Sequence, residues 1–216
     1  MQPSNEPYRF LAAALAIVLM AAALLAANAA RAGDEGLYGP AAPPGSAFVR
    51  VFNGTPQSII DARIGPEDLN EIPPFDASEF TFLPPGGYDL VAGPVKQKIT
   101  LQADRFYTAA IMNGKVQLLD NERYGNRMKA LVVLYNLAGD AALSLKTADG
   151  RTAVVEDVKP NASGQREVNA VRTQLALYKG AQRVAQVRPV TLERGRAFSL
   201  FVAGTPAQPV PVWVVN

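Results

Sequence analysis

The sequence contains no cysteine and no histidine among its 216 residues. Without cysteine, the chain can form neither a disulfide nor a thiolate nucleophile. Without histidine, it lacks the commonest general base and the commonest side-chain ligand of transition metals. A Ser–His–Asp triad, a Cys–His pair and the usual zinc sites are therefore excluded. No metal or other cofactor is expected.

Sequence motifs for phosphate or acyl chemistry are also absent. There is no GxSxG elbow, no phosphate-binding glycine loop and no dinucleotide fingerprint. A Ser–Lys dyad or a carboxylate pair stays open, since each needs only two residues brought together by the fold. Asp61 and Glu67–Asp68 are the obvious acidic candidates, but charged connections are usually solvated surface. The chain is therefore expected not to be an enzyme.

A long apolar run occurs only near the N-terminus, at Phe10–Ala26. Arg9 precedes the run, and small-residue A-x-A sequences end at Ala29 and at Ala32. This order predicts a cleavable signal peptide over residues 1–32, cut after one of these two alanines. A retained membrane anchor is the competing interpretation, although the run is near the lower length limit for crossing a bilayer. With either interpretation, the folded part lies outside the cytoplasm.

The region after the leader begins with an arm and continues with short strands. Gly33–Ser46 is rich in glycine, proline and alanine and predicts an extended arm. The PPGG sequence at Pro84–Gly87 and the pair Asn113-Gly114 are expected to be hairpin turns. The strands expected in this half are Ala47–Asn53, Ile59–Ile64, Glu79–Leu83, Tyr88–Ala92, Lys96–Leu101, Phe106–Met112 and Lys115–Leu119, with a long connection at Gly65–Ala77.

The second half repeats this scheme. AFVRVFN at Ala47–Asn53 is echoed by ALVVLYN at Ala130–Asn136, and Ile99–Ile111 is echoed by Val190–Val202. Asp149-Gly150 and Lys179-Gly180 mark further turns. The strands expected here are Ala130–Asn136, Ala141–Thr147, Thr152–Val155, Gln165–Val168, Thr173–Tyr178, Val184–Leu192, Ala197–Val202 and Val210–Val215.

The pattern predicts an all-β fold, because the strands are short and no stretch after the leader has an apolar stripe of helical period. We expect two β-sandwich domains, Ig-like or jelly-roll-like, over residues 47–121 and 129–216. A polar linker at residues 122–128 joins them.

Charge is divided unevenly between the halves. Gly33–Arg127 has 8 Lys/Arg and 12 Asp/Glu, a net charge of −4, whereas Met128–Asn216 has 11 Lys/Arg and 6 Asp/Glu, a net charge of +5. The basic half could face an acidic polymer or an acidic protein. The alternative is a solvated surface whose charges happen to segregate. Nucleic acid is not expected as a partner, because no basic run interleaves with aromatic residues.

Exposed aromatic and cationic side chains are the remaining candidates for binding. Tyr38 lies in the arm, Tyr124 in the linker, and Trp213, the only tryptophan, near the C-terminus. Arg194 and Arg196 belong to the basic half. These five residues are candidate partner or glycan contacts, since aromatic faces stack on sugar rings and arginines pair with uronate carboxylates. For Trp213, a lid over the core of the last strand is an equally good interpretation.

Several stretches carry a resemblance to a known family. They are LYGPAAPPGSAFVRVFN at Leu37–Asn53, LKTADGRTAVVEDV at Leu145–Val158, LALYKG at Leu175–Gly180, PVTLERG at Pro189–Gly195 and PVWV at Pro211–Val214. In this order they resemble the AlgF family of alginate biosynthesis proteins over nearly all of the mature chain. The resemblance implies a periplasmic accessory protein needed for O-acetylation of the exopolysaccharide alginate. The implied partners are periplasmic acetyltransferases of the SGNH-hydrolase type and a membrane-bound O-acyltransferase.

Three hypotheses remain for function. The first is a non-catalytic adaptor that links acetyltransferases and polymer through two binding modules, which raises their effective concentration. The second is a module that binds polyuronate, such as alginate, through the basic C-terminal half. The third is a carrier that holds acetyl groups as a serine or threonine ester. Deleting the arm at Leu37–Ser46 is expected to leave both domains folded and to weaken partner docking. The alternative is that the arm is part of the first sandwich, in which case its deletion would unfold that domain.

Overall fold

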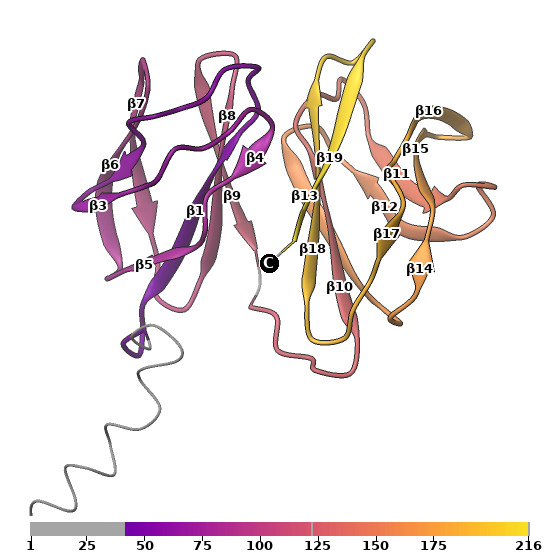
Figure 1. Ribbon diagram of the computed structural model, residues 1–216, viewed down its shortest axis with the longest axis horizontal. Coiled ribbons are helices and arrows are strands. Elements are labelled where there is room, and N and C mark those ends of the chain that lie inside the picture. Colours follow the sequence, from indigo (N-terminus) through magenta and orange to yellow (C-terminus); the bar gives the residue numbers. More distant parts are fainter. Residues whose placement is uncertain (1–41, 122, 216) are drawn as a thin grey trace, which may run out of the picture. The chain divides into compact units, whose positions relative to one another are not determined.

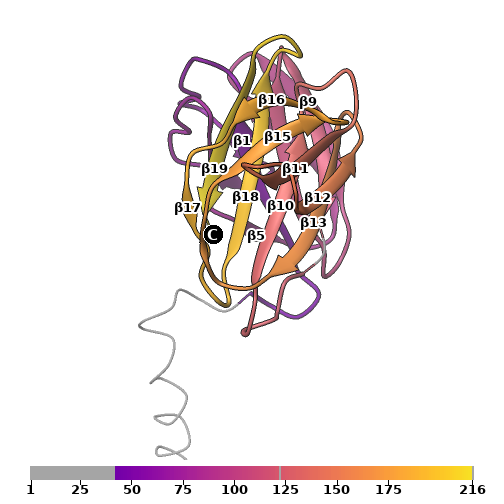
Figure 2. The same cartoon turned by 90° about the vertical axis from the view of Figure 1, so that its right-hand side faces the viewer.

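A computed structural model describes residues 42–121 and 123–215 (Figures 1 and 2). Every regular element in this range is a strand. Nothing helical in the range could therefore span a membrane. The expected signal peptide, most of the arm and Tyr38 lie outside the described residues. The prediction of an all-β chain in two parts is confirmed.

Residues 47–121 form two sheets that pack face to face. One sheet has the order β4-β1-β8-β9, with β5 also paired to β1, and the other has the order β3-β2-β6-β7. Their shared core contains Val49, Ile64 and Leu90, all fully buried. The strands are β1 (Ala47–Asn53), β2 (Arg63–Ile64), β3 (Glu67–Asp68), β4 (Asp76–Ala77), β5 (Thr81–Leu83), β6 (Gly86–Ala92), β7 (Val95–Leu101), β8 (Phe106–Met112) and β9 (Lys115–Asn121).

Residues 130–215 form a second pair of sheets. One sheet has the order β13-β10-β18-β19 and the other β12-β11-β15-β16, and β14 and β17 add a two-stranded ribbon. Val132, Leu145 and Leu200 lie in the core between the two larger sheets. The strands are β10 (Ala130–Asn136), β11 (Leu143–Thr147), β12 (Ala153–Val158), β13 (Ala162–Val168), β14 (Arg172–Thr173), β15 (Leu175–Lys179), β16 (Gln182–Gln186), β17 (Val190–Thr191), β18 (Ala197–Gly204) and β19 (Pro209–Val215).

The sequence echoes occupy matching places in the two halves. β1 runs parallel to β8, with Asn53 opposite Ile111, and β10 runs parallel to β18, with Asn136 opposite Val202. These four residues are the last positions of the four echoed segments. Both halves therefore use the echoed segments as the central strand pair of a sheet, in the same register (Figure 1).

The predicted hairpin at Pro84–Gly87 is wrong. β5 pairs with β1, whereas β6 pairs with β2 and β7, so the two strands belong to different sheets. Neither Gly86 nor Gly87 has the positive φ that a tight turn would use. The consecutive prolines instead favour an extended path, which carries the chain from one sheet to the other. In contrast, Asn113-Gly114 is a hairpin turn as predicted, with φ of 49° and 72°.

Several predicted strands are shorter or divided. Ile59–Ile64 contributes only β2 and a single bridge between Ile59 and Ile72, and the long connection that follows contains β3 and β4. The predicted strand Thr173–Tyr178 is divided between two sheets. Thr173 ends β14 in the two-stranded ribbon, and the chain from Leu175 onward forms β15 in the sheet that contains β11. Val184–Leu192 is divided between β16 and β17 around Pro189, which lacks the N–H needed for a strand ladder. The Asp149-Gly150 turn joins β11 to β12 as predicted.

Candidate functional site: a polar seam between the two halves

The central strands of both halves are covered on both faces. Every residue of β10 is buried, and so is every residue of β1 except Phe48. Each strand faces its own sandwich core on one side and the other half of the chain on the other side. We call the buried set between the two halves the seam. Its hydrophobic residues are Phe52, Ala110, Leu119, Leu131, Val133, Tyr135, Leu137, Phe201 and Ala203, and its polar residues are Arg50, Thr108 and Ser199.

Three stacked aromatic rings form the apolar part of the seam. Phe201 from β18 stacks on Phe52 from β1, with ring centroids 3.9 Å apart, and on Tyr135 from β10, with centroids 4.3 Å apart. Phe52 and Tyr135 occupy equivalent positions of the two sequence echoes. The repeated strand therefore supplies one ring to the seam from each half.

Arg50 is the cation of the seam. Its side chain is 1 % exposed, and it extends from the first half into the second. Its Nη2 atom donates to Ser199 Oγ at 2.9 Å and to Tyr135 Oη at 3.4 Å, while Nε donates to Thr108 Oγ1 at 3.2 Å. The guanidinium also lies 5.2 Å from the centre of the Phe201 ring. A buried charge is tolerated only when it is well hydrogen-bonded. Because two of the acceptors of Arg50, Tyr135 and Ser199, belong to the second half, these hydrogen bonds link the two halves.

A cavity of about 230 Å³ lies beside Arg50. It is smaller than the roughly 300–1,000 Å³ of most small-molecule pockets. Its walls combine aromatic rings with a few polar groups. The lining residues are Arg50, Phe80, Phe106, Asn121, Tyr124, Leu131, Val133, Tyr135, Gln165, Gly195, Ala197 and Ser199.

Three of the five candidate residues meet at the edge of this cavity. Tyr124 Oη donates to the carbonyl oxygen of Lys129 at 2.6 Å, and the Gly195 amide donates to the same oxygen at 2.7 Å. Arg194 and Arg196 flank Gly195 and are both exposed. Burial, and then the nearby Glu167 carboxylate, raise the pKa of Tyr124 above its usual value. The phenol is therefore neutral at physiological pH and donates this hydrogen bond.

Trp213 lies elsewhere. It is half-buried on β19 and packs against the core of the second sandwich. Its Nε1 atom donates to the carbonyl oxygen of Arg188 at 3.0 Å. This is the placement expected of a lid over the core, so the structure gives Trp213 a packing role. Its role as a binding residue stays a prediction, as does that of Tyr38.

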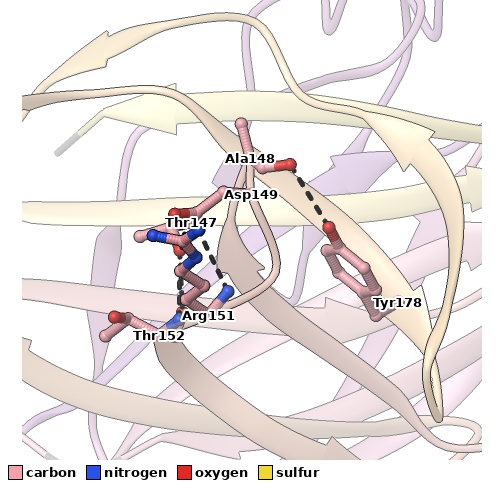
Figure 3. Close-up of polar contacts among 6 residues, drawn as sticks. All are labelled: Thr147, Ala148, Asp149, Arg151, Thr152 and Tyr178. Carbon is pink, nitrogen blue, oxygen red and sulfur yellow. Dashed lines mark hydrogen bonds and ion pairs between the residues drawn. The ribbon is translucent and has the colours of Figure 1, made fainter.

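Ser144 and Thr147 each donate to a carboxylate. Ser144 donates to Asp157 Oδ1 at 3.5 Å, a long contact, and accepts from the Asp157 amide at 3.0 Å. Thr147 donates to Asp149 Oδ1 at 2.5 Å (Figure 3). That carboxylate also accepts from the Arg151 amide at 3.1 Å, and these two bonds lower its pKa. A lowered pKa makes the carboxylate a weaker base. The Thr147–Asp149 pair therefore stabilises a turn.

The acidic candidates lie around β2, which Asp61 precedes and with which β3 pairs. Asp61 accepts a hydrogen bond from the Gly93 amide at 3.0 Å, and Glu67 and Asp68 lie on the short β3. No group of three or more acidic side chains among the described residues could hold a metal ion. Arg50 and Ser199 were not among the predicted site residues. The one available signal was an arginine within the apolar strand AFVRVFN, where the echoed strand has Val133.

The fold and the seam define an all-β protein of two packed parts. The family described as Alginate O-acetyl transferase AlgF matches residues 20–199 of the chain. The alginate biosynthesis protein AlgF of Pseudomonas aeruginosa is 44% identical over 191 residues, which are 88% of each chain. AlgF of Pseudomonas fluorescens is 44% identical over 199 residues, covering 92% of this chain and 91% of that one. The chain belongs to the AlgF family, as the sequence resemblance predicted.

Two solved structures are also similar to parts of the chain. The C-terminal domain of AlgF from P. aeruginosa is 48% identical, covers 41% of this chain and 99% of that one, and gives a TM-score of 0.38. The N-terminal domain of the same protein is 33% identical, covers 37% of this chain and 98% of that one, and gives a TM-score of 0.34.

Proposed function

We propose that this protein is a non-catalytic adaptor in the O-acetylation of alginate. Membership of the AlgF family supports a role in alginate O-acetylation. The proposed partners are the periplasmic SGNH-type acetyltransferases and the membrane-bound O-acyltransferase of the pathway. The predicted signal peptide would place the adaptor in the periplasm. The domain boundaries proposed for it remain residues 47–121 and 129–216, with a linker at 122–128.

The observation that carries the proposal is the seam. Arg50 and Phe52 from one half pack against Ser199 and Phe201 from the other. This burial couples two sandwiches of opposite net charge, while their other surfaces stay available to different partners. Holding two partners on one scaffold turns their encounter into an intramolecular event and raises its rate without new chemistry. The family description names a transferase, and the adaptor proposal assigns the transfer step to the partners.

The test is co-purification of the full mature chain from alginate-producing cells. We expect acetyltransferases of the pathway to co-purify with it, and we expect its deletion to abolish acetylation but not polymer synthesis. Incubation with an acetyl donor followed by intact-mass measurement should show no acetyl adduct on the chain. A stable adduct that the polymer removes would favour the acetyl-carrier hypothesis. Absence of every acetylation component from the purified sample would reject the adaptor.

A matched variant separates binding from folding. Phe201→Ala should loosen the seam and leave each sandwich core intact, because Phe201 belongs to the seam cluster. We expect partners to bind this variant singly but not together. Ile60→Ala is the control, since Ile60 is 76% exposed and contributes to neither the seam nor a core. If the Phe201→Ala variant binds both partners at the same time at the wild-type level, then the seam is not needed to hold the two partners together.

A further inference from the structure

The end of the second half at which β10 and β18 begin carries basic and apolar side chains together (Figure 1). Three loops meet there, Arg123–Lys129, Asn169–Arg172 and Glu193–Arg196, and we call this surface the basic end. The loops contain six lysines or arginines and one acidic residue. Glu122, which precedes the first loop, lies outside the described residues. We propose that the basic end is a docking surface for an acidic segment of a partner protein, and that this segment also presents apolar side chains.

Hydrogen bonds hold the three loops side by side. The Gly195 amide donates to the Lys129 carbonyl at 2.7 Å, and the Leu192 amide, just before the third loop, donates to the Val171 carbonyl at 3.0 Å. The Lys129 Nζ atom donates to Asn169 Oδ1 at 2.6 Å. The loops therefore form one continuous surface, on which a single partner segment can contact all three.

The positive charge of the basic end is available to a partner. Four of its arginines are exposed and form no ion pair with another residue in the described ranges: Arg123, Arg127, Arg172 and Arg194. The nearby acidic side chains are engaged, since Glu193 pairs with Arg196 at 3.2 Å and Glu167 accepts from Asn126 at 2.6 Å. Carboxylates of a partner can meet the four arginines without breaking an ion pair within the described chain. Guanidinium groups suit this contact, because they bind carboxylates in a bidentate way.

Exposed apolar side chains lie among these arginines. Met128 and Val171 are 67% and 53% exposed, and they are two of the four large apolar side chains that are exposed in the described ranges. Both are aliphatic, so they offer no flat aromatic face for a sugar ring, whereas apolar side chains of a polypeptide can bury them. Methionine adapts its shape to different partners and is common on protein-binding surfaces. The combination of arginines and aliphatic side chains therefore favours a polypeptide over a charged polysaccharide.

The seam cavity adds a place for one side chain of the partner. Tyr124 and Gly195 belong to the basic end, and both line the cavity. At about 230 Å³ the cavity has room for one small group. Protein interfaces commonly depend on a few apolar side chains that insert into such pockets. One apolar side chain of the segment can therefore enter the cavity while its acidic neighbours contact the arginines.

The docking surface deepens the adaptor proposal and rests on it for the role of the partner. It does not rest on it for the chemistry of the partner, which follows from the charge and exposure of the three loops. The two proposals can therefore fail separately. Co-purification tests the adaptor, and cross-linking from single positions tests the surface.

The experiment replaces Met128 by the photo-cross-linking residue benzoylphenylalanine in the full mature chain, in alginate-producing cells. We expect irradiation to join this position to a protein, and mass spectrometry to identify an acidic segment with apolar residues at the cross-link. Ile60 is the control position, since it is 76% exposed and lies outside the basic end. The segment joined at Met128 should not be joined at Ile60. No cross-link, or cross-links only to phospholipid, to polysaccharide or to a second copy of the chain, would overturn the proposal.

Charge variants measure the part played by the arginines. With the cross-linking residue at Val171, Arg127→Glu/Arg194→Glu should lower the yield of the same cross-link by about tenfold or more, because two attractive contacts become repulsive. The control Lys159→Glu/Arg183→Glu makes the same change of charge at exposed positions outside the three loops and should change the yield by less than about twofold. Equal losses in both would mean that net charge alone attracts the partner, and would overturn the proposal.

Met128→Ser tests the apolar part of the surface and leaves every charge in place. We expect it to lower the yield from Val171 by about threefold or more, whereas the control Ile60→Ser should leave the yield unchanged. An unchanged yield in Met128→Ser would mean a surface that recognises charge only, against the proposal. All substituted side chains are exposed, so thermal melting should match the wild type. If acetylation components co-purify with the wild-type chain but the cross-link does not depend on the arginines, the docking surface is rejected and the adaptor stands.

Discussion

Ser199 Oγ accepts a hydrogen bond from Arg50 Nη2 at 2.9 Å, although the two residues are 149 positions apart in the chain. Both side chains are almost fully buried. The loss of a hydrogen bond between buried groups costs more than the loss of one at the surface. The pair is therefore a direct test of how strongly the two halves depend on each other.

We expect Ser199→Ala to lower the free energy of unfolding by about 1–3 kcal/mol, because a buried charged donor loses its shorter Nη2 hydrogen bond, whereas the longer Nη2 bond to Tyr135, at 3.4 Å, remains. Urea denaturation followed by fluorescence measures this change. Ser58→Ala is the control and should stay within about 0.5 kcal/mol, because Ser58 is exposed. A Ser199→Ala effect no larger than that of the control would mean that Arg50 does not depend on this contact.

Local pattern predicted the strands well and their partners poorly. The bounds of β1, β8 and β10 follow from apolar runs. These runs end at Asn53, at Met112 before the Asn113-Gly114 turn, and at Asn136. The parallel pairing of β1 with β8 joins segments separated in the sequence by six other strands, and no local rule identifies such a pair. For the same reason, local pattern predicts that the PPGG segment reverses the chain within one sheet, whereas in the structure this segment carries the chain from one sheet to the other.

The sequence predicts individual candidate residues but not which of them lie together in the fold. The sequence indicates Tyr124, Arg194 and Arg196 as separate positions, and the Lys129 carbonyl brings their two loops together. Arg50 was missed because a charged residue in an apolar strand does not show which partners will neutralise or bind it. A charged residue within an apolar strand, such as Arg50, breaks the local sequence pattern, and such breaks are expected at functional or strained sites.

The second prediction compares the two echoed asparagines. Asn53 Nδ2 donates to the carbonyls of Gln57 and Ile72 at 2.7 and 3.0 Å, and its Oδ1 accepts from the Thr55 amide. Asn136 Nδ2 also donates to two carbonyls, but its buried Oδ1 has no hydrogen-bond partner among the described residues. Truncation of Asn136 therefore removes an unsatisfied atom together with its two bonds.

We expect Asn53→Ala to cost roughly 2–4 kcal/mol of unfolding free energy and Asn136→Ala to cost about 1–3 kcal/mol. Parallel urea titrations of the two variants give the comparison. A larger loss for Asn136→Ala than for Asn53→Ala would contradict the hydrogen-bond assignment in the second half.

The third prediction concerns the Asp149 turn in acid. The Thr147 hydroxyl, and then the Arg151 amide, hold the pKa of Asp149 below its ordinary value of 3.8. A lowered folded pKa means that the ionised carboxylate stabilises the fold at pH values above 3.8. That contribution is lost as the pH falls through the folded pKa. NMR titration of the carboxyl carbon should show Thr147→Val raising the pKa of Asp149 more than Arg151→Ala does, because Arg151→Ala removes only the smaller effect of the guanidinium charge and keeps the backbone amide. The reverse order would refute this account.

The last prediction concerns Tyr124 in alkali. Burial, and then the Glu167 carboxylate, raise the pKa of Tyr124 above its ordinary value of 10.0. A raised folded pKa means that the neutral phenol stabilises the fold below pH 10.0, and that this stabilisation is lost as the pH rises through the folded pKa. Ionisation also removes the hydrogen bond to the Lys129 carbonyl, which holds the linker against Gly195.

Ultraviolet difference titration against Tyr124→Phe measures this pKa. We expect Glu167→Gln to lower the pKa of Tyr124 but to leave it above 10.0, because burial is the larger cause. Glu156→Gln is the control, since Glu156 is an exposed carboxylate on β12 and not a cause of the shift. A fall all the way to 10.0 in Glu167→Gln would mean that the carboxylate alone sets the shift and that the ring of Tyr124 is solvated, which would also remove it from the wall of the seam cavity.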